Sequence, residues 1–339
     1  MMRKIAFLFP GQGSQEVGMG RDLFGRDSFA DELAAVASAE IGEDVARICV
    51  RGPEKKLAET HLLQPALTVV SLALWRRLGE AGIRADAVAG HSLGEIPALA
   101  AAGMAHPRDA VVLAAARGKA MGEAAAAQSG GMLAVTGLDE RAVASAIAPL
   151  LDRGAIGIAA INAPSQIVVS GDAALVAEAE RELARHPGAK LTRLRVAGAW
   201  HSPHMRPAAE AFAGALGALE LERAASADEA PLAQTWKRGP RPRARLGEAI
   251  PMIFNRHGHA AAEPAAVREL LAGQLESPIR FDMVMRRLAE MKVTDYVEIG
   301  PGSVLRGLVR LNLPDPEIRV HGVSDLRSAE RTAVALLST

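Results

Sequence analysis

Apolar runs of two lengths alternate along much of the chain. Short runs at 4–9 and 85–90 have the length of buried strands, and a third begins at Val297 and ends in the turn Gly300–Gly302. Longer stretches rich in alanine and leucine are typical of helices, which we predict at 27–48, from 60 to about 79, at 93–102, from about 107 onward and at 269–274. This alternation of strands and helices predicts an α/β fold.

The residues between about 131 and 197 follow a different order of elements. Their pattern predicts, in sequence, a strand at 132–136, a helix at 140–151, a hairpin of 156–161 with 167–170, a helix at 174–184 and a strand at 191–196. Strand, helix, strand, strand, helix, strand is the order of a split βαβ or ferredoxin-like unit. We therefore expect a small domain at 131–198, inserted into a large α/β domain made of 1–130 and 199–339.

The stretch from Val88 to Ile96 contains the pattern Gly-x-Ser-x-Gly, with Ser92 at its centre. Because an apolar strand precedes it and a helical pattern follows, Ser92 is expected on a tight turn that Gly90 and Gly94 permit. The adjacent helix N-terminus would supply unpaired N–H groups and partial positive charge, which suits a nucleophile whose reaction builds an oxyanion. The alternative is an ordinary strand-to-helix turn without chemistry.

Composition excludes several classes of partner. The 339 residues include 39 basic and 39 acidic side chains, so no global field attracts nucleic acid or an anionic membrane. No stretch reaches about 18 uninterrupted apolar residues, and the apolar run at 5–9 is too short for a signal peptide. Cys49 is the single cysteine, which excludes an internal disulfide. We expect a cytoplasmic protein that binds neither nucleic acid nor membrane.

A few other side chains are candidates for chemistry. Arg117 shares a predicted helix face with small and apolar residues, so it either faces inward toward an anion or forms a surface ion pair with Glu123 or Asp109. His201 and His204 flank a predicted helix start capped by Ser202 and are the natural candidates for a base; a structural role is the alternative.

Two further stretches invite a functional interpretation that we do not favour. The histidines of His257-Gly258-His259 have no third ligand at a recognisable spacing, so a loop is expected there and no metal site. The stretch 224–249 is rich in proline, arginine and alanine; we expect a solvated loop, with a basic patch for an acidic protein partner as the alternative.

Several short motifs, taken together, resemble the malonyl-CoA:acyl carrier protein transacylases, the acyltransferases of bacterial fatty acid synthesis and of polyketide synthases. They occur in family order between about residues 4 and 310: Phe9-Pro10-Gly11-Gln12-Gly13-Ser14-Gln15, Gln64-Pro65-Ala66-Leu67, Gly90-His91-Ser92-Leu93-Gly94-Glu95, Arg117-Gly118, Asn162-Ala163-Pro164, His201-Ser202, Gln274-Leu275 and Gly300-Pro301-Gly302. The resemblance implies an α/β-hydrolase-like large domain that carries the ferredoxin-like small one.

The resemblance also implies catalytic roles. Ser92 would attack the thioester carbonyl of malonyl-CoA while His201 removes its proton and later returns one to the departing thiolate. The N–H groups of Gln12 and Leu93 would form the oxyanion hole. A main-chain carbonyl near Gln274 would orient His201 in place of the carboxylate of a full triad.

Substrate selection is implied as well. Arg117 would grip the free carboxylate of malonate through two parallel hydrogen bonds. The bulk of Trp200 would crowd an α-methyl group, which favours malonyl over methylmalonyl. Gln274, Asn162 and Met121 complete the residues expected to contact the substrate. No cofactor is implied beyond the substrate malonyl-CoA, and the partner is an acyl carrier protein. We expect a monomer.

Three other functions remain open from the sequence. A transacylase for another dicarboxylic unit, such as methylmalonyl, would use the same residues. A hydrolase that clears acyl groups from carrier proteins would use the same acyl-serine, although a buried Arg117 argues against acyl groups that lack a carboxylate. A catalytically silent docking subunit would be recruited through the basic stretch at 224–249.

Overall fold

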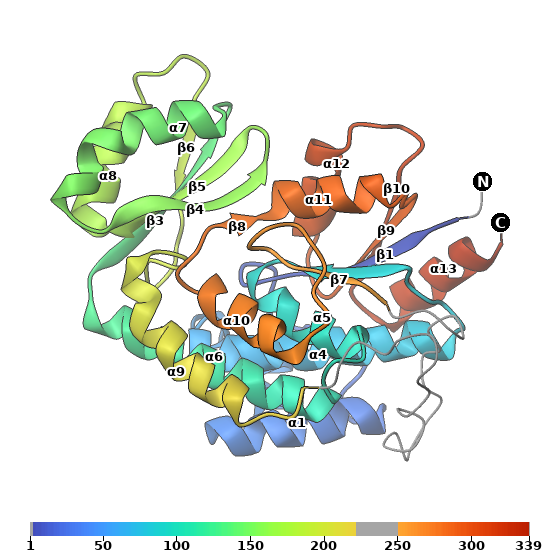
Figure 1. Ribbon diagram of the computed structural model, residues 1–339. Coiled ribbons are helices and arrows are strands. Elements are labelled where there is room, and N and C mark those ends of the chain that lie inside the picture. Colours follow the sequence, from blue (N-terminus) through green and yellow to red (C-terminus); the bar gives the residue numbers. More distant parts are fainter. Residues whose placement is uncertain (1–2, 222–249, 339) are drawn as a thin grey trace.

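A parallel sheet organises the larger part of the molecule. The computed structural model describes residues 3–221 and 250–338, and within them five parallel strands lie in the order β10-β9-β1-β2-β7 (Figure 1). Their bounds are Ile5–Phe9 for β1, Ala87–Gly90 for β2, Met252–Ile253 for β7, Asp295–Ile299 for β9 and Arg319–Val323 for β10. The strands β1, β2 and β9 are almost entirely buried because helices cover both faces of the sheet.

Long helices pack below the sheet in the view of Figure 1, with α4 lying against α1 and α6. The helices of this part are α1 (Ser28–Ile41), α2 (Val45–Arg51), α3 (Glu54–Leu57), α4 (Thr60–Glu80), α5 (Glu95–Ala101), α6 (Pro107–Ala127), α9 (Arg206–Gly217), α10 (Pro264–Gln274), α11 (Phe281–Glu290), α12 (Val304–Asn312) and α13 (Leu326–Leu337). On the opposite face lie α11 and α12, close to the second sheet.

The second sheet confirms the order of elements predicted from the middle of the sequence. Its strands lie in the order β6-β3-β5-β4-β8, and the first four pair antiparallel as in a ferredoxin-like unit. The elements are β3 (Gly130–Thr136), α7 (Glu140–Ile147), β4 (Ile156–Ala163), β5 (Gln166–Asp172), α8 (Ala173–Leu183), β6 (Lys190–Arg193) and β8 (Ile279–Arg280). A separate hydrophobic cluster that includes Leu133, Val143 and Val169 lies between this sheet and its helices.

One strand of the second sheet comes from outside the predicted insertion. Strand β8 pairs parallel with β4 through Ile279 and Arg280, and it leads directly into α11. The sheet is therefore mixed, and its outer edge is supplied by the C-terminal part of the chain. The division of the chain at 130/131 and 198/199 stays a prediction.

Two predicted helices are shorter than expected. The stretch at 27–48 forms α1 and α2 rather than one helix, because Gly42 ends α1 in the left-handed conformation (φ 72°). The helix predicted at 140–151 ends at Ile147 and continues as a 3₁₀ segment, because Pro149 has no N–H to donate to the helical ladder.

The basic stretch 224–249 lies outside the described residues. Within the described part, no helix is long and apolar enough to cross a membrane.

A buried ionic cluster ties together the amino-terminal ends of the parallel strands. Asp295 is completely buried and accepts hydrogen bonds from Arg3, Arg319, His321 and Thr294. Burial opposes the ionisation of Asp295, but the hydrogen bonds outweigh it and lower its pKa to about 2. The cluster joins β9, β10 and the start of β1, so it fixes the relative register of three strands.

We expect Asp295→Asn to lower the free energy of unfolding at pH 7 by about 1–3 kcal/mol, since it removes charge-assisted hydrogen bonds. Because the pKa of Asp295 lies below its ordinary value of 3.8, the stabilisation is complete above pH 3.8 and disappears as the pH falls through 2. Urea unfolding of both proteins at pH 7, 4 and 3 measures this difference.

The exposed Asp152→Asn serves as the control and should match the wild type at every pH. A difference between wild type and Asp295→Asn that is as large at pH 3 as at pH 7 would contradict the assignment.

Candidate active site

The serine at the predicted turn has a backbone conformation that residues with side chains rarely adopt. Strand β2 ends at Gly90, and Ser92 has a φ of 52° at the start of the 3₁₀ turn Ser92–Gly94. A Cβ on Gly90 would lie 1.9 Å from the carbonyl carbon of Gly94, and one on Gly94 would lie 1.9 Å from the oxygen of Phe9. Only glycine fits on either side of Ser92, so the turn is as tight as the motif predicts.

His201 contacts the hydroxyl of Ser92 although the two residues are far apart in the sequence. Ser92 Oγ lies 2.8 Å from His201 Nε2, and His201 Nδ1 lies 2.9 Å from the main-chain oxygen of Gln274. Because a carbonyl only accepts, Nδ1 carries the proton and Nε2 is left to accept from the serine hydroxyl. Burial, reinforced by the charge of Arg117, lowers the pKa of His201 to about 3, so the imidazole is neutral at pH 7.

Arg117 faces inward, and the alternative of a surface ion pair is wrong. Its side chain is 1% exposed; Nη1 donates to Gln64 Oε1 at 2.9 Å, and Nη2 donates to both Ser92 Oγ at 3.0 Å and Gln274 Oε1 at 2.8 Å. The close approach of α6 to α4 depends on Gly118, where a Cβ would lie 2.8 Å from a backbone oxygen of α4. Burial lowers the pKa of Arg117 to about 10, which leaves the guanidinium charged at pH 7.

The residues predicted for the oxyanion hole are Gln12 and Leu93. Among the main-chain hydrogen bonds that lie outside helices and strands in the described residues, none is donated by the N–H of Gln12 or Leu93. The loop that carries Gln12 packs directly on the turn, since a Cβ on Gly11 would lie 2.5 Å from the oxygen of His91. The loop of Gln12 thus lies against the segment that leads into Ser92 and Leu93, and the role of the two N–H groups as an oxyanion hole stays a prediction.

The other residues predicted for substrate binding lie at varying distances from this centre. Met121 is buried one helical turn from Arg117, and its sulfur lies 3.3 Å from Gln64 Nε2. Asn162 lies on β4, and its Oδ1 is 2.8 Å from Nε2 of His91, the neighbour of Ser92. Met121 is therefore connected to Arg117 through Gln64. Asn162 is hydrogen-bonded to the residue that precedes Ser92.

Trp200 and His204 have different surroundings. Trp200 is buried next to the base, with its indole ring against Gly198, where a Cβ would lie 2.9 Å from the ring. His204 pairs with Asp172 Oδ1 at 2.8 Å. His204 thus connects the segment after the base to the second sheet, and of the two candidate histidines only His201 contacts Ser92.

Sequence reasoning missed two residues that support the turn, Glu95 and Asn255. Glu95 is 1% exposed and accepts from Asn255 N–H and from Gln274 Nε2, both at 2.5 Å. Asn255 is completely buried, and its side chain accepts from Ser92 N–H at 2.8 Å and donates to Gly90 O at 2.6 Å. The available signals were weak: Glu95 is the one charged residue of the otherwise apolar helix α5, and Asn255 is the first polar residue after the apolar run that ends at Phe254.

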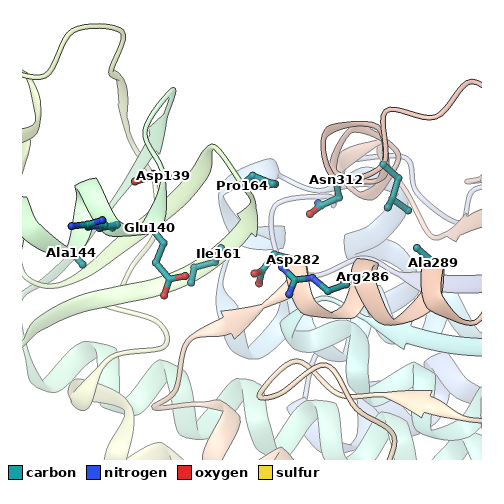
Figure 2. Close-up of a pocket in the computed structure, with 11 residues that line it drawn as sticks. Asp139, Glu140, Ala144, Ile161, Pro164, Asp282, Arg286, Ala289 and Asn312 are labelled. Carbon is teal, nitrogen blue, oxygen red and sulfur yellow. The ribbon is translucent and has the colours of Figure 1, made fainter.

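A pocket of about 700 Å³ opens between the second sheet and the helices α11 and α12 (Figure 2). Glu140 of α7 lines one side, and Asp282 and Arg286 of α11 line the other. Arg280 contacts both Glu140 and Asp282, at 3.4 and 2.9 Å. None of the residues predicted for the site lines this pocket. The described residues contain no group of three or more His, Cys, Asp or Glu side chains arranged to hold a metal ion.

The comparison with known proteins agrees with this geometry. The family model of the acyl transferase domain matches residues 6–315. Over 311 residues the chain is 38% identical to the malonyl CoA-acyl carrier protein transacylase of Bacillus subtilis, covering 91% of this chain and 90% of the relative. It is 39% identical to the polyketide biosynthesis protein ThaF of Burkholderia thailandensis, covering 91% of this chain and 24% of that protein.

Solved structures give the same result. A malonyl-transacylase determined in complex with a type II PKS acyl-carrier protein superposes with a TM-score of 0.85 at 30% identity, covering 99% of this chain and 100% of the other. The match extends through both sheets, because it covers nearly every residue of each chain. The chain therefore belongs to the acyl transferase family and, within it, to the malonyl-CoA:acyl carrier protein transacylases.

Proposed function

We propose that Ser92 takes a malonyl group from malonyl-CoA as an ester and passes it to the phosphopantetheine thiol of an acyl carrier protein. The observation that supports this most directly is the convergence on one atom: Ser92 Oγ lies within hydrogen-bond distance of both the neutral base His201 and the buried cation Arg117. A nucleophile, a base and a carboxylate-binding group are the parts that transfer of a dicarboxylic acyl group needs.

In the first step Ser92 Oγ attacks the thioester carbonyl while Nε2 of His201 takes the hydroxyl proton. The negative charge on the carbonyl oxygen would be held by the N–H groups of Gln12 and Leu93; one such donor is typically worth about 2.7–4 kcal/mol of barrier lowering. The tetrahedral intermediate then collapses, the C–S bond breaks, and His201 returns the proton to the thiolate of coenzyme A. A malonyl ester on Ser92 remains.

In the second step the same groups act on the carrier. The thiol of the phosphopantetheine gives its proton to His201, its sulfur attacks the malonyl ester, and Ser92 leaves with that proton. The complex of the similar malonyl-transacylase with an acyl-carrier protein supports an acyl carrier protein as partner. A cytoplasmic location and a monomeric state stay predictions.

Arg117 would select the acyl group. A malonyl carboxylate can accept two parallel hydrogen bonds from its guanidinium, whereas an acetyl group leaves the buried charge without an anion. In the free protein the guanidinium donates to three neutral oxygens, those of the Gln64 and Gln274 amides and of the Ser92 hydroxyl. The nearby acidic group is Glu95. We further propose that the indole of Trp200 disfavours an α-methyl group, so that malonyl is preferred to methylmalonyl.

Acylation of Ser92 is tested directly by mass. Incubation of the protein with malonyl-CoA should add one malonyl group, and Ser92→Ala should add none, because the ester oxygen is missing. Intact-mass spectrometry measures both, with the exposed Ser129→Ala as the control that keeps its label. Labelling of Ser92→Ala would reject the assignment, and release of free malonate in preference to malonyl-carrier would favour a hydrolase instead.

Arg117→Ala should lower kcat/KM for malonyl transfer by a factor of tens to thousands, since an unpaired buried charge or carboxylate costs about 2–5 kcal/mol. Acetyl transfer should be spared, because acetyl has no carboxylate to lose. Carrier acylation from malonyl-CoA and acetyl-CoA measures the ratio. Arg108→Ala, an exposed position on the same helix, is the control. Equal losses for the two donors would show that Arg117 does not bind the carboxylate.

The lowered pKa of His201 predicts how acylation depends on pH. For an imidazole with the ordinary pKa of 6.5, the neutral fraction would fall about eightfold between pH 7 and pH 5.5. With a pKa of about 3 the imidazole of His201 stays neutral over this range. The rate constant for the burst of coenzyme A release should therefore change by less than about twofold. Stopped-flow measurement tests this, with protein returned from pH 5.5 to pH 7 as the control for denaturation. An eightfold fall would contradict it.

A further inference from the structure

The buried carboxyl of Glu95 has no step in the mechanism above, yet it lies directly behind the site. Both of its oxygens face donors: Oε1 accepts from the backbone N–H of Asn255, and Oε2 accepts from Nε2 of Gln274. A carboxylate satisfies two donors at once, whereas an amide offers one acceptor and one donor. The arrangement therefore requires glutamate rather than its isosteric amide.

The bond from Gln274 fixes which way its side-chain amide points. Its Nε2 donates to Glu95 and also to the main-chain oxygen of Ser92, at 3.0 Å. With both hydrogens of the amide nitrogen turned to this side, Oε1 necessarily faces the other way and accepts from Nη2 of Arg117 at 2.8 Å. The reverse orientation would place an NH₂ group against the guanidinium, donor against donor.

We propose that Glu95 is a positioning residue for acyl selection: it holds the Gln274 amide in the orientation that directs the Arg117 guanidinium at the acyl group on Ser92. The proposal rests on the proposed role of Arg117 in binding the malonyl carboxylate. Nη2 of Arg117 is shared between Gln274 Oε1 and Ser92 Oγ, so the direction of this nitrogen depends on where the amide oxygen lies.

Two opposing effects act on the charge of Glu95. Burial raises its pKa to about 8, while the backbone N–H of Asn255, Nε2 of Gln274 and the nearby Arg117 favour the ionised form. The two donors that face its two oxygens are the geometric observation that supports a carboxylate here. The same burial lowers the pKa of Arg117, and Glu95 opposes that change. A buried cation and a buried carboxyl thus stabilise each other across the Gln274 side chain, without blocking the nitrogens that face Ser92.

Asn255 supports a different atom and supplies the contrast for a test. Its side chain holds the N–H of Ser92 and the oxygen of Gly90, so it braces the strained turn and does not contact Arg117. Loss of this brace should slow acylation of Ser92 by every acyl group to the same extent.

The experiment compares malonyl and acetyl transfer in Glu95→Gln. The new amide must lose one of its two donors or flip Gln274, so kcat/KM for malonyl should fall about tenfold to a hundredfold. Acetyl transfer should fall by a clearly smaller factor, because acetyl has no carboxylate for Arg117 to bind, so the malonyl-to-acetyl ratio should drop at least about threefold. Asn255→Ala should instead lower kcat/KM for malonyl transfer and for acetyl transfer in equal proportion. Thermal unfolding verifies that each variant is folded at the assay temperature.

A double variant shows whether Glu95 acts through Arg117. In the Arg117→Ala background, Glu95→Gln should produce no further change in the malonyl-to-acetyl ratio. Should Glu95→Gln fail to fold, Gln274→Met removes the amide itself and should give the same shift in selectivity.

The outcomes separate the two proposals. Equal losses of malonyl and acetyl transfer in Glu95→Gln, or unchanged selectivity in Gln274→Met, overturn the positioning role while a selective Arg117→Ala upholds the function of Arg117. A non-selective Arg117→Ala overturns both, since Glu95 is then left with no carboxylate-binding group to position.

Discussion

Burial of the Arg117 guanidinium constrains everything around it. A charge with 1% exposure has no water to solvate it, so the protein must surround it with acceptors and place an acid nearby. Gln64 and Gln274 provide neutral oxygens, and Glu95 provides the acid. The remaining side of the guanidinium faces Oγ of Ser92, the atom that would carry the acyl group. Solvation of one cation thus explains why three polar side chains from three helices are buried together.

The parallel sheet brings the other parts of the site to one edge. Gln12 follows β1, Ser92 follows β2 and Asn255 follows β7, and these three strands are neighbours in the sheet. The carboxyl ends of parallel strands share an edge, where loops can position groups from distant parts of the sequence. Strain at Ser92, with its φ of 52°, is tolerated because the hydrogen bond from Ser92 N–H to Asn255, the bond from Asn255 to Gly90 O and the close packing of glycine backbones hold the turn in this conformation.

The charge of Arg117 affects the protonation of His201 in a way that suits the proposed chemistry. Positive charge on Arg117 makes an imidazolium at His201 less favourable, as does burial. A proton taken from Ser92 is therefore readily given up again to the leaving thiolate. The orienting group of His201 is a carbonyl oxygen of Gln274, which fixes the tautomer without adding a negative charge that would retain the proton.

The sequence by itself determined the elements and the main chemical groups. Apolar runs located β1, β2 and the end of β9 but not β7, β8 or β10. The strand and helix order in the middle of the chain predicted the ferredoxin-like unit, and Gly-x-Ser-x-Gly predicted the turn at Ser92. These features depend on local periodicity and on backbone space, both of which are written in neighbouring residues. The errors were local too: Gly42 and Pro149 ended helices earlier than periodicity alone indicated.

Only the tertiary structure decided which polar groups meet. The inward direction of Arg117 was open in the sequence because an arginine on a helix face suits either an internal anion or a surface partner, and the packing of α6 on α4 settles it. Glu95 and Asn255 gave no strong signal, since they are 160 residues apart and their hydrogen bonds form only when β7 lies beside β2. Hydrogen bonds between distant segments depend on the arrangement of the whole chain, so no local pattern encodes them.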